Sequence, residues 1–183
     1  PKTNVENILA QIKEDYSAAH GFLFGGDYSQ IINNSNSTTS GIKELKGVVQ
    51  GVYDTGMEEV YVQGNHDASV NDLTATGDHD TDDYGVFSIN EDDFSSGGNV
   101  SSNMLTDLEN YLDRKVSEKY KKPVFVTTHL PLHATSRGDN TGASEIFTLL
   151  NEAGESGLNI IFLFGHNHSG GYDDFLGAGS VYL

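Results

Sequence analysis

Residues 159–168 read NIIFLFGHNH, an apolar run of strand length that ends in a glycine and two histidines. The same arrangement occurs three more times, at residues 21–27 (GFLFGGD), 59–67 (EVYVQGNHD) and 123–129 (PVFVTTH). Each run has the length of a buried strand, and each is followed by residues typical of loops. We therefore predict four strands that end in polar clusters.

The segments between these strands carry apolar residues at the three- and four-residue spacing of amphipathic helices. Residues 33–40 (NNSNSTTS) are polar and aperiodic, which predicts a surface loop before the second helix. A fifth strand is predicted at 84–89. Strands that alternate with helices indicate an α/β fold, and the length fits a single domain over residues 1–183. The predicted helices cover about residues 4–19, 41–54, 101–121 and 142–154.

The composition restricts both the partners and the chemistry of the chain. Ten Lys and Arg residues against 27 Asp and Glu residues give a formal net charge of −17, which disfavours general nucleic-acid binding and anionic membranes. A small phosphorylated substrate is compatible with this charge, because bound metal ions invert the potential locally. The absence of cysteine excludes thiolate metal sites, disulfides and cysteine nucleophiles. No apolar run approaches the ~18 residues of a membrane span, so we expect a soluble protein, either secreted or cytoplasmic.

The polar residues after the strands form a set of hard oxygen and imidazole ligands. In α/β sheets such residues gather beyond the carboxyl ends of the strands. A mixture of imidazole and carboxylate suits Mn, Fe, Zn or Ni better than Ca, which prefers oxygen ligands alone. Asp27 by itself fits an ordinary turn residue equally well, but two histidines at i and i+2 after an apolar strand are harder to explain in that way. The set comprises Asp27, Asn65, His66, Asp67, His129, His166 and His168.

In their order along the chain, four of these clusters resemble motifs of the calcineurin-like metallophosphoesterases. Residues 26–27 (GD) resemble the second motif and residues 64–67 (GNHD) resemble the third. Residues 128–129 (TH) resemble the fourth and residues 165–168 (GHNH) the fifth, so that the resemblance spans most of the chain. It implies a four-layer α/β/β/α sandwich, with two mixed sheets flanked by helices. It also implies hydrolysis of phosphate mono- or diesters by a metal-bridging hydroxide at a dinuclear site.

The family pattern assigns the metal ligands residue by residue. It implies that Asp27 bridges two divalent or trivalent ions. Asn65, His129 and His166 would complete the shell of the second metal, and His168 would belong to the first. His66 and Asp67, by contrast, are the catalytic residues that the resemblance implies.

In this family pattern His66 is not a metal ligand. It would donate to the leaving-group oxygen or stabilise the charged transition state, while Asp67 would hold the imidazole through its other nitrogen. The two residues are adjacent within the GNHD stretch.

The first family motif, an Asp-x-His upstream of the 4–19 helix, has no counterpart in these residues. Residues 78–80 (DHD) lie in a loop after the third motif, and we do not regard them as a substitute. We therefore expect a domain that is incomplete at its N-terminus and at its C-terminus, with a complete second metal site and a first site that lacks two ligands. The alternative is a non-catalytic metal-binding or adhesion module on the same fold.

Several further residues have weaker signals. The acidic loop at residues 72–83 lacks the Gly and Glu of an EF-hand, so we interpret it as a solvated lid beside the active site. His133 and Arg137 follow the fourth motif and are candidate contacts for substrate. Tyr28 is a candidate pocket residue. His20 and His79 are interpreted as surface residues, and the sequence does not specify the substrate or the oligomeric state.

Overall fold

Two β-sheets and four α-helices form the part of the chain that the computed structural model describes, residues 2–53, 56–94, 100–132 and 143–166. A mixed α/β fold is thereby confirmed. The helices are α1 (Lys2–Asp15), α2 (Ser35–Val52), α3 (Ser102–Ser117), α4 (Ala143–Glu155) and the short 3-10 helix η1 (Glu91–Asp93). The strands are β1 (Gly21–Phe24), β2 (Glu58–Tyr61), β3 (Gly77–Asp78), β4 (Gly85–Ile89), β5 (Val124–Thr128) and β6 (Ile160–Phe164).

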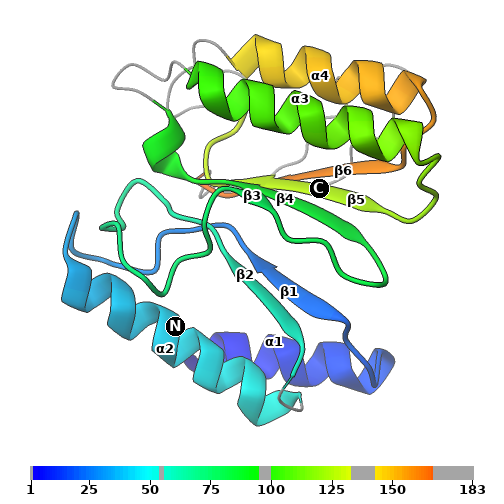
Figure 1. The fold of residues 1–183 in the computed structure, drawn as a ribbon. Coiled ribbons are helices and arrows are strands. Elements are labelled where there is room, and N and C mark those ends of the chain that lie inside the picture. The colour runs from blue at the N-terminus through cyan, green and yellow to red at the C-terminus, as the bar shows by residue number, and fades with distance from the viewer. Residues whose placement is uncertain (1, 54–55, 95–99, 133–142, 167–183) are drawn as a thin grey trace.

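The strands fall into two separate sheets. β1 and β2 form a parallel pair in which Phe24 lies opposite Tyr61. The other sheet has the order β3-β4-β5-β6, with β3 antiparallel to β4 and the remaining strands parallel. Because β4, β5 and β6 are in register, their last residues Ile89, Thr128 and Phe164 lie side by side. Figure 1 shows α3 and α4 over the outer face of this sheet, and α1 and α2 beneath the two-stranded sheet.

Three clusters of apolar side chains hold these elements together. α3 and α4 pack on the four-stranded sheet through fully buried residues such as Leu108 and Ile146. Val62 and Val86 belong to a second cluster, between the two sheets. Val49 of α2 lies in the third, against α1 and the outer face of β1. Complete burial of each such side chain contributes about 1.5–3 kcal/mol, so the helices and sheets stabilise one another through these clusters.

The first helix is shorter than the sequence predicts and buries a narrower face. α1 ends at Asp15 rather than at residue 19, because the chain has to leave the helix to enter β1. Leu9 is buried, but Ile8, Ile12 and Tyr16 of the predicted apolar stripe remain 58%, 43% and 69% exposed. α1 therefore packs against α2 and β1 along only one edge of that stripe.

The loop predicted at residues 33–40 is wrong, because α2 begins at Ser35. The side-chain oxygen of Asn34 accepts a hydrogen bond from the backbone N–H of Ser37 at 2.9 Å and caps the helix. Thr38 is buried in the first turn, and its hydroxyl accepts from the backbone N–H of Ala68 at 3.0 Å. The polar run therefore caps α2 and fixes the segment that follows Asp67 by a hydrogen bond.

Part of the acidic loop also differs from the prediction of a solvated lid. Asp78 ends β3 and forms an ion pair with Arg114 of α3. Asp80 binds Lys115 of α3 and accepts from the backbone N–H of Val86, at the amino end of β4. The site residues follow the opposite, carboxyl ends of the strands. These two aspartates therefore attach α3 to the sheet and do not cover the site.

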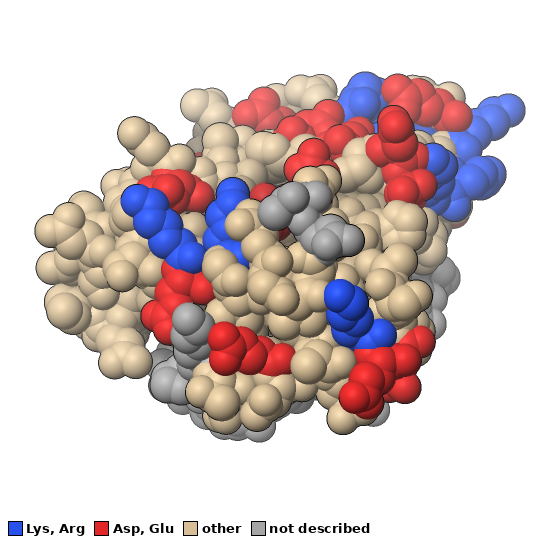
Figure 2. Space-filling view, turned by 90° about the horizontal axis from the view of Figure 1, so that it is seen from below, with Lys and Arg blue, Asp and Glu red and all other residues tan. Residues whose placement is uncertain are grey.

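The face formed by α1 and α2 is largely uncharged, and its acidic and basic side chains lie scattered (Figure 2). No helix in the described residues is both long and apolar enough to cross a membrane.

Candidate metal site

The parallel register of β5 and β6 places two histidines next to each other. Thr128 and Phe164 are paired at the ends of these strands. His129 follows Thr128 directly, and His166 lies two residues after Phe164. The backbone N–H of Gly165 donates to the carbonyl of His129 at 3.0 Å, which continues the pairing. The two imidazole rings consequently meet edge to face, with centroids 5.1 Å apart.

The other sheet delivers Asp27 and Asn65 to the same place. β1 and β2 end in register, and Asp27 and Asn65 lie in the loops that follow them. Asp27 has a φ of 62°, and His166 across the site has a φ of 65°. Positive φ is uncommon for residues other than glycine and is concentrated at functional sites. Both side chains are thus directed inward by turns that the surrounding structure has to stabilise.

Glycines allow the loops of the two sheets to approach closely. A Cβ on Gly64 would lie only 2.4 Å from the backbone nitrogen of Asp27, and one on Gly26 would lie 2.8 Å from Nδ1 of His129. A Cβ on Gly165 would lie 2.6 Å from the carbonyl oxygen of Gly25. Only glycine can occupy such positions without displacing the backbone, so these residues determine how near the ligands can come.

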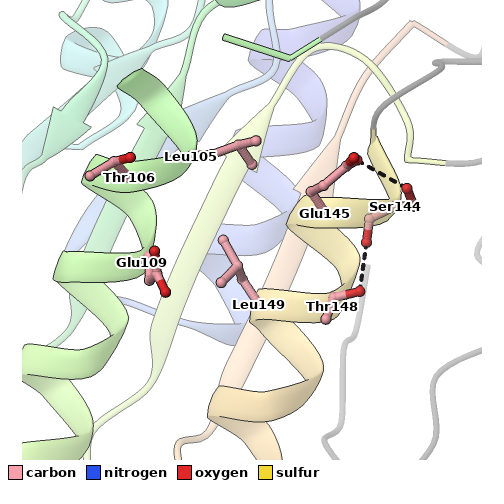
Figure 3. A pocket seen from close by; sticks show the side chains of 7 residues that line it. All are labelled: Leu105, Thr106, Glu109, Ser144, Glu145, Thr148 and Leu149. Atoms are coloured by element: carbon pink, nitrogen blue, oxygen red, sulfur yellow. Dashed lines mark hydrogen bonds between the residues drawn. The ribbon is translucent and has the colours of Figure 1, made fainter. Parts of the chain in front are cut away.

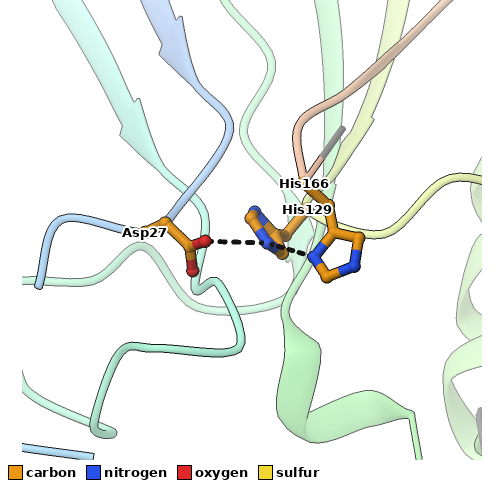
Figure 4. A group of neighbouring side chains, drawn as sticks. All are labelled: Asp27, His129 and His166. Atoms are coloured by element: carbon orange, nitrogen blue, oxygen red, sulfur yellow. Dashed lines mark hydrogen bonds and ion pairs between the residues drawn. The ribbon is translucent and has the colours of Figure 1, made fainter. Parts of the chain in front are cut away.

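Four side chains converge at this junction, and Figure 4 shows three of them. Nε2 of His129 lies 3.4 Å from Oδ2 of Asp27, 3.0 Å from Oδ1 of Asn65 and 3.2 Å from Nδ1 of His166. Oδ1 of Asn65 lies 2.9 Å from Nδ1 of His166. Ligand atoms of Asp27, His129 and His166 all lie within 4.8 Å of one another.

The hydrogen-bond partners of His129 show which of its ring nitrogens carries the hydrogen. Its Nδ1 lies 2.5 Å from the carbonyl oxygen of Gly25, which can only accept, so Nδ1 carries the hydrogen. In the neutral ring Nε2 then presents a lone pair. That lone pair faces oxygens of Asp27 and Asn65, which also carry lone pairs. His129 is buried with 1% of its surface exposed, so solvent does not separate these lone pairs, and either a hydrogen on Nδ1 of His166 or a bound cation would stabilise them.

The same residues fit a metal ion well. Imidazole nitrogen, carboxylate oxygen and amide oxygen are the ligands that borderline transition metals accept. The carbonyl of Gly25 orients His129 in the manner of the outer hydrogen bonds that fix metal-binding histidines. A backbone carbonyl has no sequence signature, so this contact could not be predicted from residue types.

Asp67 does not hold the His66 ring as expected. Its Oδ2 accepts from the backbone N–H groups of Asp27 at 2.8 Å and Gly64 at 2.9 Å, and its Oδ1 accepts from Ser29 at 3.0 Å. Burial raises the pKa of Asp67, and the hydrogen bonds from these three amides oppose the shift. Both carboxylate oxygens are therefore used to join the loops that follow β1 and β2.

His66 lies beside the four converging residues, half-buried. Its backbone N–H donates to Oδ1 of Asp27 at 3.0 Å, and its carbonyl accepts from the backbone of Asn33 at 2.9 Å. Within the described residues its imidazole makes no hydrogen bond. The main chain of His66 is thus fixed next to Asp27 while its ring keeps both nitrogens available.

Tyr28 and Glu91 lie near the site, and both have raised pKa values. The hydroxyl of Tyr28 donates to the carbonyl of Phe24 at 3.1 Å, and burial raises its pKa well above the ordinary value, so it supports the loop. Glu91, at the start of η1, was not predicted as a site residue. Its pKa is raised by burial first and then by the charges of Asp92 and Asp27, which places it in the electrostatic field of the site. The available signal was its position two residues after the end of β4.

His168, His133 and Arg137 lie outside the described residues. His20 is on the surface as predicted, with a side chain that is 69% exposed and an ion pair to Asp83.

Comparison of the chain with protein-family models, curated proteins and solved structures gives no match.

Proposed function

We propose that the chain is a metal-dependent phosphoesterase that hydrolyses phosphate mono- or diesters, with the four-layer α/β/β/α architecture of the calcineurin-like enzymes. The observation that supports this proposal most is the meeting of lone pairs around Nε2 of His129. Oxygens of Asp27 and Asn65 lie 3.4 and 3.0 Å from this Nε2. The hydrogen of the ring is on its other nitrogen, Nδ1, which faces the carbonyl of Gly25. Such an arrangement is stable when a cation occupies its centre.

The proposed ligands also give the site a suitable charge. Asp27 is the single formal anion among Asp27, Asn65, His129 and His166, so a divalent ion bound by them keeps a net positive charge. On a chain with a formal charge of −17, this creates a local point that attracts a phosphate group. In the proposal His168 and Asp27 contribute to a second ion. Bound metal ions would supply the Lewis acidity that polarises the phosphoryl group and activates water.

His66 has the properties of a proton donor to the leaving-group oxygen. Its backbone is held by Asp27 and Asn33, so its ring is positioned beside the ligands without being one of them. An imidazole can carry a proton and donate it to a leaving-group oxygen. Asp67 is a positioning residue in this scheme, because it fixes the backbone of Asp27 and Gly64.

The experiment compares hydrolysis of p-nitrophenyl phosphate and bis(p-nitrophenyl) phosphate by wild type, His66→Ala and His79→Ala in the presence of Mn²⁺. We expect His66→Ala to lose about 10²–10⁴-fold in kcat while it still binds metal. His79→Ala is the matched control, since His79 contacts the carbonyl of Ala75 and the neighbouring aspartates of its segment bind α3. Full activity of His66→Ala would contradict the assigned role. Metal binding without hydrolysis of either ester would favour the non-catalytic module.

A further inference from the structure

The outer face of α3 and α4 carries a groove that the proposed metal site does not use. The two helices run side by side in the same direction, and two adjoining hollows of ≈ 360 and ≈ 200 Å³ lie along their seam. Glu109 and Leu149 line both hollows, which makes the groove continuous. Figure 3 shows the residues that line the larger hollow. From Leu105 to Val116 on α3 the groove is about 16 Å long at 1.5 Å per residue, or about three helical turns.

The groove has an apolar floor and acidic walls. Leu105 and Leu149 project between the helices and are half-buried (Figure 3). The walls carry four exposed carboxylates, and among the residues that the structure describes no Lys, Arg or His lines either hollow. The four are Glu109, Asp113, Glu145 and Glu152.

The basic residues of these helices are engaged elsewhere. α3 has Arg114 and Lys115 alone, which pair with Asp78 and Asp80 on the side of β3 and β4. α4 has no basic residue. Within the described residues none of the wall carboxylates has an ion pair, and Glu145 only accepts a hydrogen bond at 3.0 Å from the hydroxyl of Ser144. The groove is therefore left with uncompensated negative charge above an apolar floor.

We infer that this groove docks a Lys- and Arg-rich amphipathic helix of a partner protein. The occupant has to be cationic, and the formal charge of −17 disfavours a second copy of the chain, a nucleic acid or an anionic membrane. The floor favours apolar side chains, which a small polyamine lacks. A helix of about three turns fills the length and can present apolar residues at i, i+3, i+4 and i+7 with basic residues beside them.

The carboxylates are spaced to meet such a helix. Glu109 and Asp113 are four residues apart on α3, and Glu145 and Glu152 are seven apart on α4, so each pair lies on one helix face. Basic side chains on both flanks of the bound helix would therefore find a carboxylate. Ion pairs at the rim contribute little singly, so the apolar contacts with Leu105 and Leu149 have to supply part of the affinity.

The test uses a fluorescein-labelled amphipathic peptide of about four helical turns, made of Leu and Lys in this pattern, titrated into the full chain at about 0.15 M salt. Binding is read by fluorescence anisotropy, and helix formation of the unlabelled peptide by circular dichroism. The triple variant Glu109→Gln, Asp113→Asn, Glu152→Gln is expected to bind about tenfold more weakly, which is about 1.4 kcal/mol. Leu149→Ser is expected to weaken binding by a similar factor, because it removes one of the two apolar side chains that form the floor of the groove.

The matched control removes the same number of charges far from the groove, on α1: Glu6→Gln, Glu14→Gln, Asp15→Asn. At this salt concentration the Debye length is about 8 Å, so the control should bind within about twofold of wild type. Equal weakening by both triple variants would overturn the inference, because binding would then follow net charge alone. Undiminished binding by Leu149→Ser, with competition by spermine, would overturn it in favour of a site for small polycations. Near-equal unfolding temperatures of all variants establish that the fold is retained.

Discussion

Asp67→Asn tests how the two ligand-bearing loops are joined. The substitution keeps the size of the side chain but replaces one carboxylate oxygen with an NH₂ group. In wild type Oδ2 accepts two backbone N–H groups and Oδ1 accepts a third. The best orientation of asparagine keeps its oxygen towards Asp27 and Gly64, which places the NH₂ group against the N–H of Ser29. One hydrogen bond is then lost and two donors face each other.

The magnitude follows from these three contacts. A hydrogen bond to a charged acceptor is worth about 1.5–3 kcal/mol, and the two remaining bonds weaken because the acceptor becomes neutral. Relief from burying a carboxylate offsets part of this loss, since burial raises the pKa of Asp67 in the folded chain. We expect a net loss of about 2 kcal/mol in the free energy of unfolding. For a chain of this size that corresponds to a fall in Tm of about 4–8 °C.

Urea denaturation followed by circular dichroism measures this loss. Asp72→Asn is the control, because Asp72 is exposed and accepts a single hydrogen bond from the described residues, donated by the hydroxyl of Thr39. Its unfolding free energy should stay within about 0.5 kcal/mol of wild type. Metal affinity of Asp67→Asn should fall about 10–100-fold, since Asp27 loses its outer support. An Asp67→Asn protein as stable as wild type, with unchanged metal affinity, would refute the reasoning.

Two further predictions concern packing and pH. Gly64→Ala would bring a Cβ within 2.4 Å of the backbone of Asp27. It should lower the free energy of unfolding, measured by urea denaturation, by about 1–3 kcal/mol and weaken metal binding. Gly47→Ala, with nothing within 4 Å of its Cβ, should change neither quantity. Burial raises the pKa of Asp80, but hydrogen bonds led by that from Lys115 outweigh it and the pKa is lowered. Its stabilisation is therefore present above the unfolded-state pKa of about 3.9 and disappears as pH falls through the lower folded-state value. Lys115→Met should reduce this part of the acid dependence, measured as unfolding free energy against pH. An unchanged pH profile would contradict the role of the pair.

The elements that carry the site were predictable from the sequence because their signals are local. Each apolar run of four to six residues became a strand within one residue of its predicted bounds, for example β4 at Gly85–Ile89 for the prediction at 84–89. The parallel register follows from the alternation of strands with helices, and it brings His129 and His166 together without further information. For the same reason Asp27 and Asn65 end at one edge of their sheet.

Features that depend on distant partners were not predictable. The beginning of α2 was missed because Asn34 and the serines after it also fit a turn, and capping by Asn34 decided the outcome. Asp80 pairs with a residue 35 positions away, so its loop could not be separated from a solvated one. The carboxylate of Asp67 was predicted to hold the ring of its sequence neighbour His66. Its three partners are instead backbone amides, which have no sequence signature.

The most direct test of the proposed metal site is isothermal titration of the metal-free chain with Zn²⁺ and Mn²⁺. We predict binding of at least one ion per chain with a Kd of about 1 μM or tighter for one of the two metals. His129→Ala should weaken this binding at least about 100-fold, because its Nε2 is the atom at which the other ligands meet. His20→Ala, which removes an exposed histidine far from the junction, should leave the affinity unchanged. Absence of binding to wild type, or equal binding by His129→Ala, would contradict the assignment of a metal site.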